Sequence, residues 1–166
     1  MRKVNEFTAW FCKMLLIIMV PVMTVIVFVQ VLLRYVFSAP LVWVEEAAKY
    51  LLVWVSFFGS AYAVRYGMHI TLIFLNNKFR GYAKLVLDLG IQLLLIVFSA
   101  ICVIEGMNLS LGQWDQMSPG MRIPQALPYM AMPIAFAFII LYSIEFVIDD
   151  VKKVVLQKEG GLKEKK

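Results

Sequence analysis

The sequence predicts an all-α integral membrane protein with four transmembrane helices. Of its 166 residues, 62% are apolar and 16% are charged, whereas soluble domains have roughly 45–50% apolar and about 25% charged residues. Four stretches with few or no charges are each about as long as the roughly 20 helical residues that cross the hydrocarbon of a bilayer. The sequence lacks the short alternating segments that are typical of membrane β-barrels.

The charged residues set the approximate bounds of the four spans. Residues 14–33 and 123–144 contain no charge, whereas the spans at 46–64 and 85–104 carry Lys49 and Asp88 near one end, where a polar side chain can reach the headgroups. All four should be helices, because lipid offers no partner to unpaired backbone groups. We expect residues 1–150 to form a single four-helix domain and residues 151–166 a charged, solvated tail.

The positions of Lys and Arg predict the orientation, because basic loops stay in the cytoplasm. With both termini in the cytoplasm, all but three of the 16 basic residues lie on that side, and the exceptions are Arg34, Lys49 and Arg122. The prediction is therefore N-in and C-in. The net charge of +5 then reflects topology rather than nucleic-acid binding. No small-residue cleavage site precedes the first span, so we expect it to be kept as an anchor.

The connections between the spans carry further candidates. The cytoplasmic connection, residues 65–84, contains the apolar stretch Ile70–Leu75, which is too short to span and is expected to be an in-plane interfacial segment. Four residues in this connection are candidates for lipid headgroups: Arg65, His69, Lys78 and Arg80. Outside, Glu45 and Glu46 either stabilise the positive end of the second helix or contact a partner.

One face of the second span carries small residues. Ser56, Ser60, Ala63 and Gly67 follow one another at helical spacing, with Gly59 beside them. Small side chains let another helix approach closely, so this face fits packing within the chain or contact with another subunit. Aromatic residues such as Trp43 and Trp54 gather toward the outer half of the same helix, as in an interfacial aromatic belt.

The residue constellations of enzymes are missing from the sequence. His69 is the single histidine, so one chain cannot form a multi-histidine metal site or a bis-histidine haem site. GxSxG, P-loop and CxxC motifs are also missing. Cys12 and Cys102 are expected at opposite depths, which argues against a disulfide. A transporter acting alone needs polar or ionisable groups near the middle of the membrane. None of the ionisable residues of this sequence is clearly placed there. A scaffold is favoured over an enzyme, with a small proton-coupled exporter as the alternative.

Several segments together resemble a known family. They comprise Arg34–Phe37, Pro40–Glu46, then Trp54, Gly59, Ala61, Ala63, Arg65, Gly67, His69 and Ile70, and finally Ile123–Tyr129 with Pro133. In order and spacing they resemble the small membrane subunit of tripartite ATP-independent periplasmic (TRAP) transporters, the DctQ-like family. The resemblance covers most of the chain from Arg34 to about Pro133.

The resemblance implies a sodium-dependent symport complex in a bacterial inner membrane that takes up organic acids such as C4-dicarboxylates or sialic acid. Its partners would be a large membrane subunit (M subunit) and a periplasmic solute-binding protein (P subunit), with sodium bound in the large subunit and no cofactor in this chain. This chain would be a separate scaffold that braces the elevator-type large subunit. Candidate contacts with the large subunit are Arg34, Trp43, Glu46, Trp54, Ser56, Gly59, Ser60, Ala63 and Gly67. Candidates for docking of the binding protein are Glu45, Trp114, Asp115 and Arg122.

Overall fold

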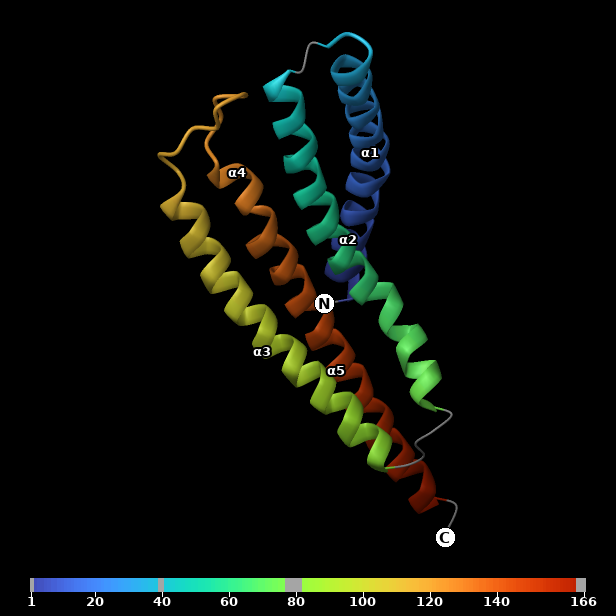
Figure 1. Ribbon diagram of the computed structural model, residues 1–166. Helices are drawn as coiled ribbons and strands as arrows, with labels where there is room; N and C mark the ends of the chain where they lie inside the picture. The colour runs from blue at the N-terminus through green and yellow to red at the C-terminus, as the bar shows by residue number, and fades with distance from the viewer. Residues whose placement is uncertain (1, 39–40, 77–81, 164–166) are drawn as a thin grey trace.

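The computed structural model describes the backbone of residues 2–38, 41–76 and 82–163, and the side chains of residues 3–38, 41–66 and 87–152. Over these residues the fold is helical, in the order α1 (Arg2–Tyr35), α2 (Val42–Asn76), α3 (Tyr82–Gly112), the short α4 (Ala126–Tyr129) and α5 (Ala131–Lys163) (Figure 1). Four segments are long and apolar enough to cross a membrane: Lys3–Tyr35, Val42–Tyr66, Leu87–Gly112 and Ala126–Lys152. The prediction of four long apolar helices is confirmed.

The helix bounds differ from the predicted spans in three places. Ile70–Leu75 continues α2 without a break instead of forming a separate in-plane segment. No proline lies between Val42 and Asn76 to end the helix, and a single glycine such as Gly67 costs only about 1 kcal/mol. At the other end of the chain, α5 continues through Lys163, whereas the predicted fourth span ended at residue 144.

The third difference concerns the start of the fourth span. Helix begins at Ala126 rather than at Ile123, and it first forms α4 before α5 starts at Ala131. Pro124 disfavours helical geometry at Ile123, and the N–H of Gln125 is donated across the connection to the carbonyl of Gln116 at 2.9 Å. Residues 123–125 are therefore part of the connection and not of a membrane span.

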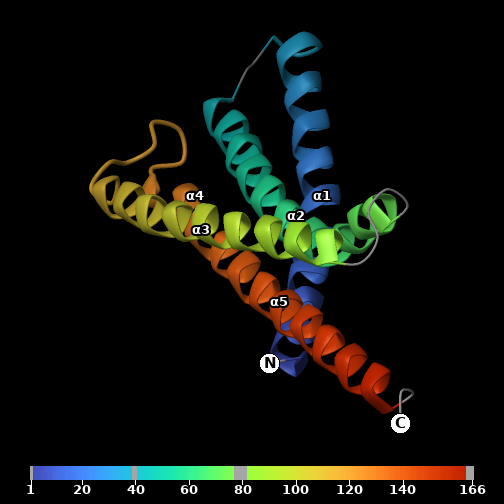
Figure 2. The same cartoon turned by 90° about the horizontal axis from the view of Figure 1, so that it is seen from below.

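The helices pack in pairs. α3 packs against α5, α1 packs against α2, and α2 also packs against α5 (Figure 1). Figure 2 shows that α3 and α5 cross at an angle and diverge toward the C-terminus. Ala61, Ala135 and Ile139 form one buried cluster between α2 and α5. Gly106 allows a close approach of α3 to the start of α5, because a Cβ there would lie 3.0 Å from the ring of Pro133. Within the part of the chain that the structure describes, α1 and α3 make no contact, so α1 depends on α2 for most of its support.

Candidate functional site

The carboxylate of Glu46 holds the connection between α3 and α4 against the start of α2. Its Oε1 atom accepts a hydrogen bond from the N–H of Gly120 at 2.9 Å, and its Oε2 atom accepts one from the N–H of Met121 at 2.8 Å. Glu46 is only 9% exposed. We call Glu46, Gly120 and Met121 the loop clamp. The sequence suggested either stabilisation of the second helix or a partner contact for this carboxylate, and it did not suggest this contact with the α3–α4 connection.

The loop clamp closes on a tight turn. Within that turn Ser118 donates its N–H to the carbonyl of Ile123 at 2.9 Å, and Arg122 donates its N–H to the carbonyl of Ser118 at 3.1 Å. Arg122 has a φ of 54°, a left-handed conformation that is uncommon for a residue with a side chain. Gly120 is required by close approach, since a Cβ there would lie 2.9 Å from the backbone nitrogen of Trp43 and 2.9 Å from Glu46 Oε2.

A second polar cluster joins three helices. Arg65 of α2 forms a bidentate contact with Glu145 of α5, with Nη1 3.2 Å from Oε2 and Nη2 3.4 Å from Oε1. Asn5 of α1 donates its amide to the same Oε2 atom and to the carbonyl of Leu141 at 3.1 Å. We call Asn5, Arg65 and Glu145 the buried ionic cluster. The side chains of Arg65 and Glu145 are 16% and 9% exposed.

The surroundings of the buried ionic cluster are aromatic and apolar. The guanidinium carbon of Arg65 lies 5.7 Å from the ring centre of Tyr142 and 5.6 Å from that of Phe146. Both rings pack against Ala9 of α1. Removing one partner from a buried ion pair leaves an uncompensated charge and costs roughly 3–5 kcal/mol. The cluster can therefore fix how α1, α2 and α5 meet.

The sequence analysis assigned Arg65 to lipid headgroups and gave no role to Glu145, so it missed their pairing. The structure places Arg65 inside the bundle because Glu145 lies on the facing side of α5. A signal was present: Arg65 directly follows the predicted second span and Glu145 directly follows the predicted fourth span, so both lie at the same predicted depth. Of the other headgroup candidates, Lys78 and Arg80 lie outside the described residues, as does the side chain of His69.

The small-residue face of α2 divides in two. Ser56, Ser60 and Ala63 are exposed, whereas Gly59 faces α1, with its Cβ position 3.9 Å from Leu16 Cδ2. Ser60 donates its hydroxyl to the carbonyl of Ser56 at 2.8 Å, which satisfies that polar group within the helix. Packing within the chain thus accounts for Gly59 and leaves the other three uncovered. Gly67, the last member of the predicted face, lies in α2 beyond the described side chains.

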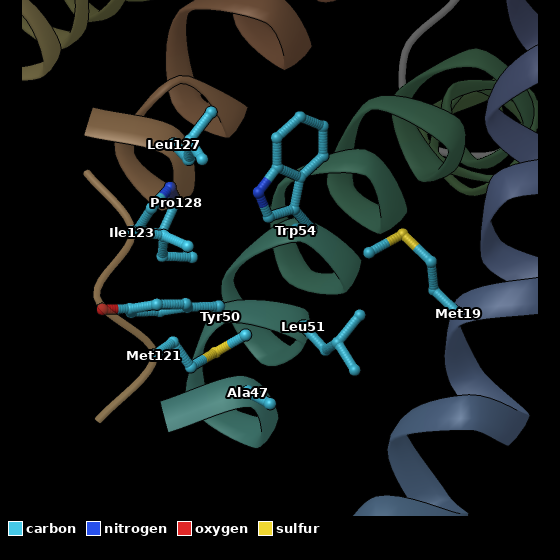
Figure 3. A pocket seen from close by; sticks show the side chains of 9 residues that line it. All are labelled: Met19, Ala47, Tyr50, Leu51, Trp54, Met121, Ile123, Leu127 and Pro128. Atoms are coloured by element: carbon cyan, nitrogen blue, oxygen red, sulfur yellow. The ribbon is translucent and has the colours of Figure 1, made fainter. Parts of the chain in front are cut away.

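An apolar hollow of about 360 Å³ lies on the side of α2 that is opposite the exposed residues Ser56, Ser60 and Ala63. Figure 3 shows α2 between Met19 of α1 on one side and the segment from Met121 to Pro128 on the other. Trp54 lines this hollow and stacks on Phe58, with ring centres 5.4 Å apart. The complete lining is Met19, Ala47, Tyr50, Leu51, Trp54, Met121, Ile123, Leu127 and Pro128. Phe58 is 1% exposed, so part of the predicted aromatic belt belongs to the core.

The remaining candidates lie on the surface near the α1–α2 connection and the α3–α4 connection. Glu45 pairs with Lys49 one turn later at 2.7 Å, and the guanidinium of Arg34 lies 5.8 Å from the ring centre of Tyr35. Trp43 and Trp114 are each 51% exposed, and Asp115 and Arg122 are exposed as well. Among the described residues, no three His, Cys, Asp or Glu side chains are arranged to hold a metal ion.

Comparison with known proteins finds similarity to small permease subunits of one family of transporters. The sequence profile described as "Tripartite ATP-independent periplasmic transporters, DctQ component" matches residues 23–153. A TRAP transporter small permease protein of Haemophilus influenzae is 27% identical over 136 residues, which cover 81% of this chain and 84% of that protein.

Two further relatives are matched over a smaller part of their own length. The C4-dicarboxylate TRAP transporter small permease protein DctQ of Rhodobacter capsulatus is 34% identical over 98 residues, which cover 56% of this chain and 42% of that protein. The sialic acid TRAP transporter permease protein SiaT of Haemophilus influenzae is 29% identical over 155 residues, which cover 88% of this chain and 24% of that protein. The chain therefore spans less than half the length of these two relatives.

Replacing Gly120 by alanine tests the loop clamp. The added Cβ meets backbone of α2, so the turn has to withdraw and the two hydrogen bonds to Glu46 lengthen. We expect a loss of stability of about 1–3 kcal/mol, measured as a lower midpoint of thermal unfolding in mild detergent. Gly112→Ala is the matched control, because its Cβ would have no atom within 4 Å. Equal midpoints for the two variants would contradict the close approach.

A double-mutant cycle tests the buried ionic cluster. We expect Arg65→Met and Glu145→Gln each to destabilise the protein by about 3–5 kcal/mol. The double variant should lose about 1–3 kcal/mol less than the sum of the two single losses, and this difference is the coupling free energy. Denaturant titration in detergent measures each value. The Glu45–Lys49 pair is exposed to solvent and is the control, for which we expect a much smaller coupling free energy. The same coupling in both pairs would refute a special role for the buried one.

Proposed function

We propose that this chain, which belongs to the family of DctQ components of tripartite ATP-independent periplasmic (TRAP) transporters, braces the large membrane subunit of such a transporter. The family is one of small permease subunits and is not enzymatic. In our proposal the complex is a sodium-coupled importer of organic acids, which a periplasmic solute-binding protein delivers. The sodium and substrate sites lie in the large subunit, and this chain takes no part in binding either.

The observation that carries the proposal is the exposed small-residue surface of α2. Ser56, Ser60 and Ala63 lie within the candidate span Val42–Tyr66, and no other helix of the described chain covers them. In lipid, apolar burial does not drive helices together, and close backbone approach at small residues supplies the packing instead. A surface of this kind suits a protein helix.

The outward surface of α1 has the opposite character. Val25 is 60% exposed and Phe28 is 63% exposed, and bulky side chains continue along the helix. Side chains of this size fill space between acyl chains and keep another helix at a distance. The contrast between α1 and α2 supports a bilayer-facing role for α1 and a partner-facing role for α2.

The two polar clusters suit a stationary support. An elevator mechanism needs one part that resists the sliding of another, so the helices of that part must keep their mutual arrangement. The buried ionic cluster ties α1, α2 and α5, and the loop clamp ties α2 to the connection before α4. Both ties include α2, the helix that we assign to the partner.

We further propose that both termini lie in the cytoplasm and that the membrane is a bacterial inner membrane. The distribution of basic residues supports this orientation. The α3–α4 connection then faces the periplasm, where the exposed Trp114, Asp115 and Arg122, together with Glu45, are positioned to meet the binding protein. Relatives named for C4-dicarboxylate and for sialic acid support an organic acid as the substrate class.

The contacts of two buried carboxylates, Glu46 and Glu145, argue against a small proton-coupled exporter. Such an exporter needs a carboxylate in the membrane that is able to take up and release protons during transport. Glu46 is engaged by two backbone N–H groups of the turn, and Glu145 is engaged by Arg65 and Asn5. Both are used to hold the structure together.

Copurification with the large subunit tests the small-residue surface. We expect Ser60→Leu and Ala63→Leu to lower the amount of large subunit retained in mild detergent at least fivefold, because a leucine side chain prevents close approach. Phe28→Leu, on the exposed surface of α1, is the control and should retain the partner as the unaltered chain does. Equal retention by all three variants would count against this interface.

Transport in proteoliposomes tests the division of labour. With this chain alone, uptake of a labelled organic acid should stay at the level of empty vesicles. With the large subunit and the binding protein added, uptake should require an inward sodium gradient. Uptake by this chain alone, driven by sodium or by a proton gradient, would overturn the scaffold proposal.

A further inference from the structure

The hollow beside α2 is lined mainly by residues of the candidate membrane spans. All of its lining residues except Met121 and Ile123 belong to candidate spans of α1, α2 or the α4–α5 segment. Its volume of about 360 Å³ is at the low end of the roughly 300–1,000 Å³ that is usual for ligand pockets. In the close-up, Trp54, Leu127 and Ile123 line one part of the hollow, and Leu51 and Met19 lie toward α1 (Figure 3).

The shape and lining of the hollow select a thin apolar occupant. Rings, thioethers and aliphatic groups make up its wall, so a polar segment would lose hydrogen bonds on entering. A single turn of α-helix, about 10 Å wide and 5.4 Å long, would take up the whole volume, so a transmembrane helix of a partner does not fit. In a bilayer the neighbour that does fit is an acyl chain.

Arg122 is an exposed cation that neighbours two lining residues of this hollow in the chain. It lies in the chain between Met121 and Ile123, which both line the hollow, and the turn holds it in a left-handed conformation. Of the three basic residues on this side of the protein, Lys49 pairs with Glu45 and Arg34 lies over the ring of Tyr35. The ion pairs and cation–ring contacts found among the described residues do not include the Arg122 side chain.

The geometry points to a phospholipid site: the hollow holds one acyl chain of a phospholipid from the periplasmic leaflet, and the Arg122 guanidinium donates to its phosphate. A guanidinium is well suited to phosphate oxygens, since its N–H groups match their spacing. The bound chain would fill the space between α1 and the α4 segment, which do not pack on each other. The leaflet follows from the orientation in the proposed function, so the inference rests on that proposal.

Photocrosslinking identifies the occupant of the hollow. Trp54 is replaced by the similarly bulky p-benzoylphenylalanine in the complex reconstituted into vesicles of phosphatidylethanolamine and phosphatidylglycerol, and the mass of this chain is measured after irradiation. We expect an adduct of one phospholipid. Arg122→Gln should lower its yield at least fivefold, whereas Arg34→Gln should leave it within twofold.

A second crosslinker position separates a site from bulk lipid. Phe98 lies on an exposed apolar face of α3 and is 53% exposed, so p-benzoylphenylalanine at this position should give lipid adducts that do not depend on Arg122. Adducts of the position 54 probe with the large subunit, or lipid adducts there that are insensitive to Arg122→Gln, would overturn the site. So would equal losses with Arg34→Gln, which would reflect general surface charge.

The crosslinking and copurification results together distinguish a failure of the lipid site from a failure of the scaffold proposal. If the large subunit copurifies and position 54 gives no lipid adduct, the lipid site fails and the scaffold proposal stands. If the lipid adduct forms and depends on Arg122 while no large subunit is retained by the unaltered chain, the scaffold proposal fails and the lipid site stands. The elution volume of each variant in gel filtration shows that it is folded.

Discussion

The buried ion pair between Arg65 and Glu145 is the contact on which the arrangement of the helices depends. In lipid, apolar surface is as well solvated outside a bundle as inside it, so most side-chain contacts do not select one helix arrangement over another. A charge inside the bundle does select one helix arrangement, because burying it costs free energy unless a side chain of opposite charge lies within contact distance. Asn5 adds the amino-terminal turn of α1 to the same carboxylate, so one acidic side chain determines how three helices meet.

The loop clamp acts on the same helix near its first residue, Val42. Glu46 and Arg65 are separated by about 28 Å along α2, from a rise of 1.5 Å per residue, which is close to the roughly 30 Å thickness of the hydrocarbon. The polar ties of α2 are therefore placed about one hydrocarbon thickness apart. Between them the helix carries Ser56, Ser60 and Ala63 on its exposed face and Phe58 and Ala61 in the core.

Much of this fold could be predicted from charge spacing, because charge and length determine which residues lie at which depth. The four apolar helices, the small-residue face and the carboxylates at the start of α2 were all visible in this way. The depth of a residue in the membrane does not determine the direction in which its side chain points around the helix. For that reason Arg65 was assigned to headgroups although Glu145 lies at the same depth, and the exposed part of the small-residue face was not separable from Gly59. The continuous helix through Ile70–Leu75 was missed because length alone suggested a separate segment.

The placement of the polar ties has a consequence for how a partner could bind. If the charged pair lay on the exposed face of α2, each approach or departure of a partner helix would move charges between protein and lipid, at a cost of several kcal/mol. With Arg65 and Glu145 turned inward and the hydroxyl of Ser60 bonded to its own helix, the exposed face offers close packing with little polar cost. In the function that we propose, such a support would keep its own arrangement through ionic contacts and would meet its partner through shape.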